Sequence, residues 1–361
     1  MSIIQEDLDY TWNCLTEKEK EKLSGAKILI SGIGGFLGQY YIRFFARYFD
    51  ELKLRKVIGI DNYLLGKSPL ICSYENDNRF VFYTCSLGTD PINQLSEIED
   101  ADYIIHLASI ASPIYYRKYP VDTIDSNVWG LRALLEYYKN KKIKGFLFYS
   151  SSEVYGDPFP EYIPSNENYY GNTPTIGPRA CYDESKRYGE TLSYVFHMQY
   201  NMPIRIVRLF NVYGPGLKLN DCRVPSDFAR MIAEDEPIVI YSDGTPTRSF
   251  SYVADSVVGE LKALLYDRFE CFNIGMDNHE ITIRDFAELC KKIGEKVCSY
   301  SKDIVYRVSD DANYLVHNPQ RRTPDISKAK NLLGFRPAYK LEEGFERYLR
   351  FVIENKEEQF W

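Results

Sequence analysis

Six short apolar runs, separated by stretches long enough for helices, constrain the fold of this chain more than any other feature. The runs occupy residues 26–31, 56–61, 80–84, 103–108, 145–150 and 204–210. Helix-length segments lie between them at residues 35–49, 120–138 and 179–200. Continuous apolar strands joined by helices pack as a parallel sheet that is covered on both faces. We therefore expect a doubly wound α/β domain with right-handed crossovers.

A glycine-rich turn, GIGGFLG, follows the first run and places Gly32, Gly35 and Gly38 at the entry of a helix. Such a turn lets the backbone approach a pyrophosphate, whose charge the helix N-terminus stabilises. The second run ends at Asp61, where a carboxylate can accept hydrogen bonds from an adenosine ribose and would repel a 2′-phosphate. Together these features predict a Rossmann-type NAD site. A plain tight turn and a solvated aspartate are the alternatives.

A tyrosine and a lysine four residues apart, Tyr182 and Lys186, open the segment at residues 179–200. This spacing places both side chains on one helix face. A tyrosine normally loses its proton near pH 10, so it acts as a base at neutral pH only where a cation stabilises the phenolate. Polar strand ends at Ser109 and Ser151 should lie beside the pair at the carboxyl edge of the sheet.

Five longer stretches carry a resemblance to a known family. They are HLASIASPIYYRKYPVDTIDSNVWG, SSSEVYGDP, IGPRACYDESKRYGET, RLFNVYGPGLKLNDCRV and NPQRRTPDISKAKNLLGF. Over about residues 26 to 350 the chain resembles an extended short-chain dehydrogenase/reductase of the NAD-dependent epimerase/dehydratase type. Within that group it is similar to the UDP-glucuronate decarboxylases, also called UDP-xylose synthases.

The resemblance implies which residues form the site. The catalytic residues would be Tyr182, Lys186, Ser151, Ser152 and Glu153. NAD would be bound by Gly32, Gly35, Phe36, Leu37, Gly38, Asp61, Asn62, Leu107, Ala108, Ser109, Tyr182 and Lys186. A nucleotide sugar of the UDP type would be bound by Ser112, Tyr115, Arg179, Asn211, Arg223, Tyr241, Arg248 and Arg322. Arg322, with Arg321 as a possible neighbour, is the candidate for a hexuronate carboxylate. An exposed Arg322 paired with Asp325 is the alternative.

The resemblance also implies a reaction. Tyr182 would accept the proton of the sugar 4-hydroxyl while hydride passes to NAD. The 4-keto acid would lose carbon dioxide, and the same NADH would reduce the product. Similar 4,6-dehydratases carry an aspartate where this chain has Ser152, which favours decarboxylation here.

Several positions depart from the family pattern and leave the nucleotide base and the sugar open. Ser86 stands where the decarboxylases have an aspartate, and Gly216 and Cys222 interrupt their GPR and NDGR motifs. The alternatives are a 4,6-dehydratase, a 4-epimerase or a C4 oxidase acting on another nucleotide sugar. An NAD-binding sensor without turnover is a further alternative from a different class.

The predicted domain organisation has three parts. Residues 1–25 form a helical extension, with a helix over residues 5–24 whose apolar face carries Leu8, Trp12, Leu15 and Leu23. Residues 26–209 form the NAD-binding domain, which the chain rejoins at about 238–272. Residues 210–237 and 273–361 form a smaller mixed α/β lobe for the nucleotide sugar.

The net charge of −7 argues against nucleic acid or an anionic membrane as a partner. We expect a cytoplasmic enzyme, because the start of the chain lacks a signal-like pattern and no apolar stretch is long enough to span a bilayer. The eight scattered cysteines predict reduced thiols and no metal site. By family resemblance we expect a homodimer.

Overall fold

A parallel sheet of seven strands forms the centre of the computed structural model, which describes residues 1–355. The strands lie in the order β11-β6-β5-β4-β1-β2-β3, and every neighbouring pair is parallel. They are β1 (Lys27–Ser31), β2 (Lys56–Asp61), β3 (Phe80–Thr84), β4 (Tyr103–His106), β5 (Gly145–Ser151), β6 (Ile204–Leu209) and β11 (Glu270–Ile274). The predicted doubly wound α/β fold is confirmed.

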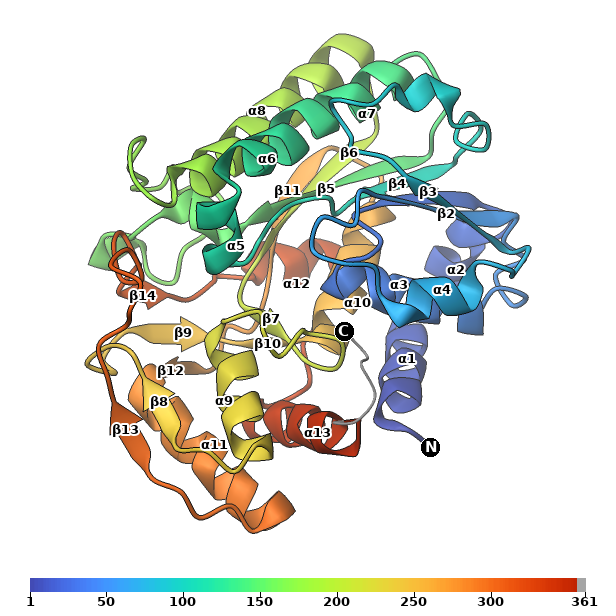
Figure 1. Cartoon of the computed structure of the whole chain (residues 1–361). Coiled ribbons are helices and arrows are strands. Elements are labelled where there is room, and N and C mark those ends of the chain that lie inside the picture. Colours follow the sequence, from blue (N-terminus) through green and yellow to red (C-terminus); the bar gives the residue numbers. More distant parts are fainter. Residues whose placement is uncertain (356–361) are drawn as a thin grey trace.

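Helices cover both faces of this sheet (Figure 1). A hydrophobic core lies on each face of the sheet, and successive residues of β1 contribute to opposite cores. Ile28 and Ile30 pack on the side of α3 and α10, while Leu29 packs on the side of α7 and α8. The surrounding helices are α3 (Phe36–Arg47), α4 (Pro69–Tyr74), α5 (Pro113–Lys118), α6 (Pro120–Ile124), α7 (Leu131–Tyr138), α8 (Ala180–Tyr200), α10 (Val253–Leu264) and α12 (Ser327–Leu333). A π-helical turn, Asp125–Gly130, joins α6 to α7. Helices therefore lie in all three segments where they were predicted.

The first 25 residues form two helices, α1 (Ile3–Cys14) and α2 (Glu17–Leu23), so the prediction of one helix over residues 5–24 was wrong. The break occurs because Thr16 caps a new helix, with reciprocal hydrogen bonds between Thr16 and Glu19. The predicted apolar side chains still face the protein, since Leu8, Leu15 and Leu23 are buried. Trp12 stacks on Tyr48 with ring centroids 4.2 Å apart.

A second group of elements lies beyond the carboxyl ends of the sheet (Figure 1). Its helices are α9 (Val224–Ala233), α11 (Ile283–Cys298) and α13 (Leu341–Glu354). Its strands are β7 (Val212–Tyr213), β8 (Ile238–Ile240), β9 (Thr247–Ser249), β10 (Ser251–Tyr252), β12 (Glu280–Thr282), β13 (Ile304–Tyr306) and β14 (Arg321–Arg322). They pair in small sheets outside the central one. The end of the predicted lobe, residues 356–361, lies outside the described residues.

Among residues 1–355, no helix has both the length and the apolar character that crossing a membrane requires.

Candidate active site

A cavity of 710 Å³ lies between the carboxyl ends of the sheet and the second group of elements. This is where ligands bind in open α/β sheets. Every catalytic, cofactor-binding and substrate-binding residue predicted from the sequence lines it. Arg321, the possible neighbour of Arg322, does not line the cavity, because its side chain turns to Glu280 on β12 with an Nη2–Oε2 distance of 2.7 Å.

The glycine turn between β1 and α3 fits a dinucleotide. Gly32 has a φ of +77°, and a Cβ there would lie 2.5 Å from the backbone nitrogen of Ala108. Asp61 at the end of β2 accepts hydrogen bonds from the backbone nitrogens of Gly34 (2.9 Å) and Tyr63 (2.7 Å). Burial raises the pKa of Asp61, although these hydrogen bonds oppose it. The carboxylate thus holds the shape of the turn as well as facing the cavity.

A buried polar side chain beside this turn also fits a cofactor. The Ser109 hydroxyl, after β4, is buried and has no hydrogen-bond partner in the described chain. A ligand in the cavity would supply the missing partner. NAD would supply hydride transfer here, and the glycine turn, Asp61 and the residues after β4 would hold it.

Tyr182 and Lys186 face the cavity from the first two turns of α8. The Lys186 ammonium donates to the carbonyl of Tyr149 on β5 (2.7 Å) and lies 5.7 Å from the centre of the Tyr182 ring. Burial lowers the pKa of Lys186 to about 7. Burial raises the pKa of Tyr182 to about 12, partly offset by a hydrogen bond with Ser151. Burial thus disfavours the charged form of both groups, and a charged Lys186 beside Tyr182 would favour the phenolate.

Glu153, after β5, is held between two guanidinium groups. Its Oε2 accepts from Arg179 Nη2 (2.5 Å) and Arg322 Nη2 (2.6 Å), and its Oε1 accepts from Arg322 Nη1. Burial raises the pKa of Glu153, but the two guanidiniums outweigh it and hold the pKa at about 2. The alternative for Arg322, an exposed side chain paired with Asp325, is wrong because Arg322 is buried and turned to Glu153.

A third buried arginine, Arg248 on β9, lies beside this cluster. It donates to the carbonyls of Thr247 (2.7 Å) and Gln320 (3.5 Å) and to the side chain of Asn318 (3.0 Å). Burial and, to a smaller extent, the charge of Arg322 lower the pKa of Arg248 to about 9. Arg179 and Arg322 share Glu153, and Arg179 also lies 3.7 Å (Nε–Oδ2) from Asp183. Arg248 has no carboxylate partner in the described part of the chain. Three guanidinium groups therefore gather at this end of the cavity beside two carboxylates, which leaves an excess of positive charge.

The segment between β7 and α9 carries Arg223 and contacts Ser112 and Tyr115, while Asn211 lies just before β7. Arg223 pairs with Asp221, whose carbonyl accepts from Ser112 (2.6 Å). Tyr115 donates weakly to the carbonyl of Asn220 (3.4 Å). Asn211, with a φ of +43°, donates to the carbonyl of Ser249 (2.9 Å).

Two features of the cavity were not predicted. The ring of Tyr116 stacks on Tyr182 with centroids 5.2 Å apart. The segment after β13 also lines the cavity. In it, the ring of Tyr314 packs against Tyr241 with centroids 5.7 Å apart, and Asp311 forms an ion pair with Arg117 of α5. No local pattern marks these residues, because the contacts join distant parts of the chain.

This fold and site define a Rossmann-type dinucleotide-dependent enzyme with a Tyr–Lys pair at the carboxyl edge of its sheet. Residues 28–275 match the model of the NAD dependent epimerase/dehydratase family, and the chain belongs to that family. It is accordingly an NAD-dependent enzyme.

Several relatives with assigned names are similar over most of the chain. The UDP-glucuronic acid decarboxylase 6 of Arabidopsis thaliana is 36% identical over 324 residues, which cover 89% of this chain and 87% of that protein. The UDP-glucuronic acid decarboxylase 1 of Danio rerio is 35% identical over 348 residues, or 96% of this chain and 76% of that protein.

Solved structures are also similar. The UDP-glucuronic acid 4-epimerase of Bacillus cereus, in complex with UDP-glucuronic acid and NAD, has a TM-score of 0.76 and 28% identity over 91% of this chain and 99% of its own. The UDP-glucose 4-epimerase of Thermotoga maritima, with UDP-glucose, has a TM-score of 0.78 and 26% identity over 91% and 99%.

Replacing Gly32 tests the cofactor turn. We expect Gly32→Ala to weaken NAD binding about 100-fold, because the new Cβ collides with the backbone of Ala108 and cannot keep the positive φ. Isothermal titration calorimetry measures the affinity. Gly25→Ala is a matched control, since Gly25 has a φ of +70° but no other atom within 4 Å of the place that a Cβ would take. It should cost about 1 kcal/mol of stability and leave NAD binding unchanged. Equal NAD affinities in the two variants would contradict this assignment.

Proposed function

We propose that this enzyme decarboxylates UDP-glucuronate by oxidising C4 of the sugar, releasing carbon dioxide and reducing C4 again with the same NADH. The observation that carries the proposal is the group of buried arginines beside Tyr182. Arg179 and Arg322 enclose Glu153, and Arg248 has no carboxylate partner in the described chain. A substrate that brings its own carboxylate and diphosphate would balance this charge. The names of the similar decarboxylases support the same choice.

The residues of the cavity have defined tasks in this proposal. Tyr182 accepts the proton of the 4-hydroxyl, because the Lys186 ammonium stabilises its phenolate. Ser151 bonds to Tyr182 and positions the same hydroxyl. Arg322 orients the hexuronate carboxylate next to the oxidised carbon. A carboxylate β to a ketone loses carbon dioxide without an acid that protonates a leaving group, so buried Ser152 suits this step. The enolate that remains takes up a proton at C5, and Tyr182 returns its proton to the C4 oxygen as hydride returns to C4.

A 4-epimerase is the second candidate, favoured by the likeness to the epimerase structure that holds UDP-glucuronic acid and NAD. Both reactions begin with the same 4-keto acid, so the products distinguish them. An epimer retains the mass of UDP-glucuronate, whereas a decarboxylated product has lost carbon dioxide.

Tyr182→Phe separates an enzyme from a binding protein. We expect the variant to bind NAD normally and to release carbon dioxide from UDP-glucuronate about 1000-fold more slowly, because it lacks the general base. Tyr194→Phe is the matched control on the same helix, since Tyr194 is exposed and outside the cavity. A Tyr182→Phe enzyme as active as the control would overturn the proposed chemistry.

Arg322→Gln tests recognition of the sugar carboxylate. We expect kcat/KM for UDP-glucuronate to fall about 100-fold, because a charge-assisted pair to the substrate is lost. The affinity for UDP, measured by calorimetry, should change little. Arg321→Gln is the control, because Arg321 is the adjacent arginine but pairs with Glu280 outside the cavity. If both variants behave alike, Arg322 does not select the carboxylate.

We also propose a homodimer formed through α6 and α8. These two helices contact each other and leave apolar side chains exposed. The exposed residues are Val121, Ile124, Tyr188, Val195 and Met198. Burying such a face between two copies removes apolar area from water.

Sedimentation equilibrium should give twice the mass of one chain, and Val195→Glu should give a monomer. Val308→Glu, on an exposed position elsewhere, should remain a dimer. A monomeric wild-type protein would exclude this interface.

The cytoplasm remains the proposed location. All eight cysteines are free thiols, which is typical of proteins in a reducing compartment.

A further inference from the structure

Three residues at four-residue spacing on α8 meet three consecutive residues of β5. Tyr182 bonds to Ser151, and the Lys186 ammonium donates to the carbonyl of Tyr149. One helical turn further on, Glu190 accepts a hydrogen bond from the Ser150 hydroxyl (2.5 Å). Tyr182 and Lys186 have roles in the proposed reaction, whereas Glu190 has none.

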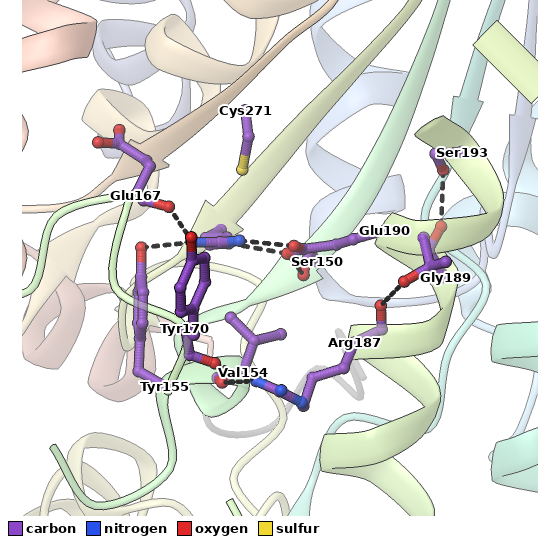
Figure 2. Close-up of polar contacts among 12 residues, drawn as sticks. Ser150, Val154, Tyr155, Glu167, Tyr170, Arg187, Gly189, Glu190, Ser193 and Cys271 are labelled. Atoms are coloured by element: carbon purple, nitrogen blue, oxygen red, sulfur yellow. Dashed lines mark hydrogen bonds and ion pairs between the residues drawn. The ribbon is translucent and has the colours of Figure 1, made fainter. Parts of the chain in front are cut away.

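Glu190 is held rigidly from its other side. Arg208 on β6 binds both carboxylate oxygens, with Nε–Oε1 and Nη2–Oε2 distances of 2.8 and 2.6 Å. Figure 2 shows Ser150 and Glu190 facing each other, with Tyr155 and Glu167 to their left. The Arg208 Nη1 donates to the Tyr155 hydroxyl (2.8 Å) and to the Glu167 carbonyl (3.2 Å). Such a bidentate, networked carboxylate has little freedom to move.

This network reaches the segment that carries Arg322. The Tyr155 hydroxyl donates to Asn273 Oδ1 (2.7 Å), and Asn273 Nδ2 donates to the carbonyls of Ser165 (2.9 Å) and Asp325 (3.0 Å). Asp325 lies three residues after Arg322. Glu190 therefore belongs to one continuous set of hydrogen bonds that joins the Tyr–Lys helix to the segment that carries Arg322.

We propose that Glu190 is a positioning residue for the Tyr182–Lys186 pair, because it fixes α8 against the end of β5 through Ser150 and against β6 through Arg208. The inference rests on the proposed role of that pair. A buried lysine tends to lose its proton, and a carboxylate nearby opposes that loss. Few ionisable groups lie close enough to Lys186 to affect its pKa.

Glu190 raises the pKa of Lys186, and Tyr182 lies beside Lys186 on α8. His106 on β4 stays neutral, because burial and the charge of Lys186 lower its pKa to about 3.

The groups that face Glu190 come from three strands. Arg208 lies on β6 and Ser150 on β5. Cys271 lies on β11, and burial raises the pKa of its thiol, so it remains neutral. Glu190 is thus paired with Arg208, and its charge also acts on Lys186, which lies one turn earlier on α8.

The test is the titration of Lys186 itself, followed by NMR of protein labelled with carbon-13 at the lysine side chains. Lys186→Arg identifies the signal by its loss. We expect Glu190→Gln to lower the pKa of Lys186 by about one unit, because an opposite charge is removed. Glu190→Asp, which keeps the charge, should leave the pKa near that of the wild type. In turnover, the loss of activity at alkaline pH should move to lower pH in Glu190→Gln alone.

A second variant keeps the test usable if Glu190→Gln does not fold. Glu190→Gln leaves Arg208 buried without a counterion, so the double variant Glu190→Gln/Arg208→Gln removes both charges together. It should lower the pKa of Lys186 in the same direction. An unchanged pKa of Lys186 in the folded variant would overturn the inference. This result is independent of the proposed reaction, which fails instead if the wild-type enzyme releases no carbon dioxide and Tyr182→Phe behaves as wild type does.

Discussion

The contact between the Lys186 ammonium and the end of β5 determines where chemistry takes place in this protein. Taking an ammonium out of water is costly, and burial lowers the pKa of Lys186 to about 7. The carbonyl of Tyr149, two residues before the end of β5, compensates in part. The ammonium can then stabilise a phenolate at Tyr182. The parallel sheet positions the other residues of the site, because it brings the carboxyl ends of β1, β2, β4 and β5 to one edge.

Electrostatic balance links this pair to the other end of the cavity. Glu153 keeps its charge because Arg179 and Arg322 surround it. Arg248 lies beside them and has no carboxylate partner among residues 1–355. The protein as a whole carries a net charge of −7, so the positive charge is local to the cavity. An acidic protein can bind an anionic nucleotide sugar only through such a concentrated group.

Much of this site could be predicted because its signals are local in the sequence. The glycines from Gly32 to Gly38 and the Tyr182–Lys186 spacing each lie within one turn or one helix. The break between α1 and α2 was missed, although Thr16 and Glu19 form a capping box that the sequence contains. The partner of Arg322 was beyond prediction, because Glu153 lies 169 positions away and the two meet only after β14 pairs with β9. The same holds for Arg117 and Asp311, which are 194 positions apart.

The central claim is that oxidation at C4, loss of carbon dioxide and reduction at C4 occur in one site with one cofactor. Mass spectrometry of the product formed from UDP-glucuronate with deuterium at C4 tests it most directly. The account predicts a UDP-pentose that has lost carbon dioxide and still carries deuterium at C4, because the hydride removed there returns to the same carbon. A product that keeps its carboxyl group, or a pentose without deuterium, would contradict the account.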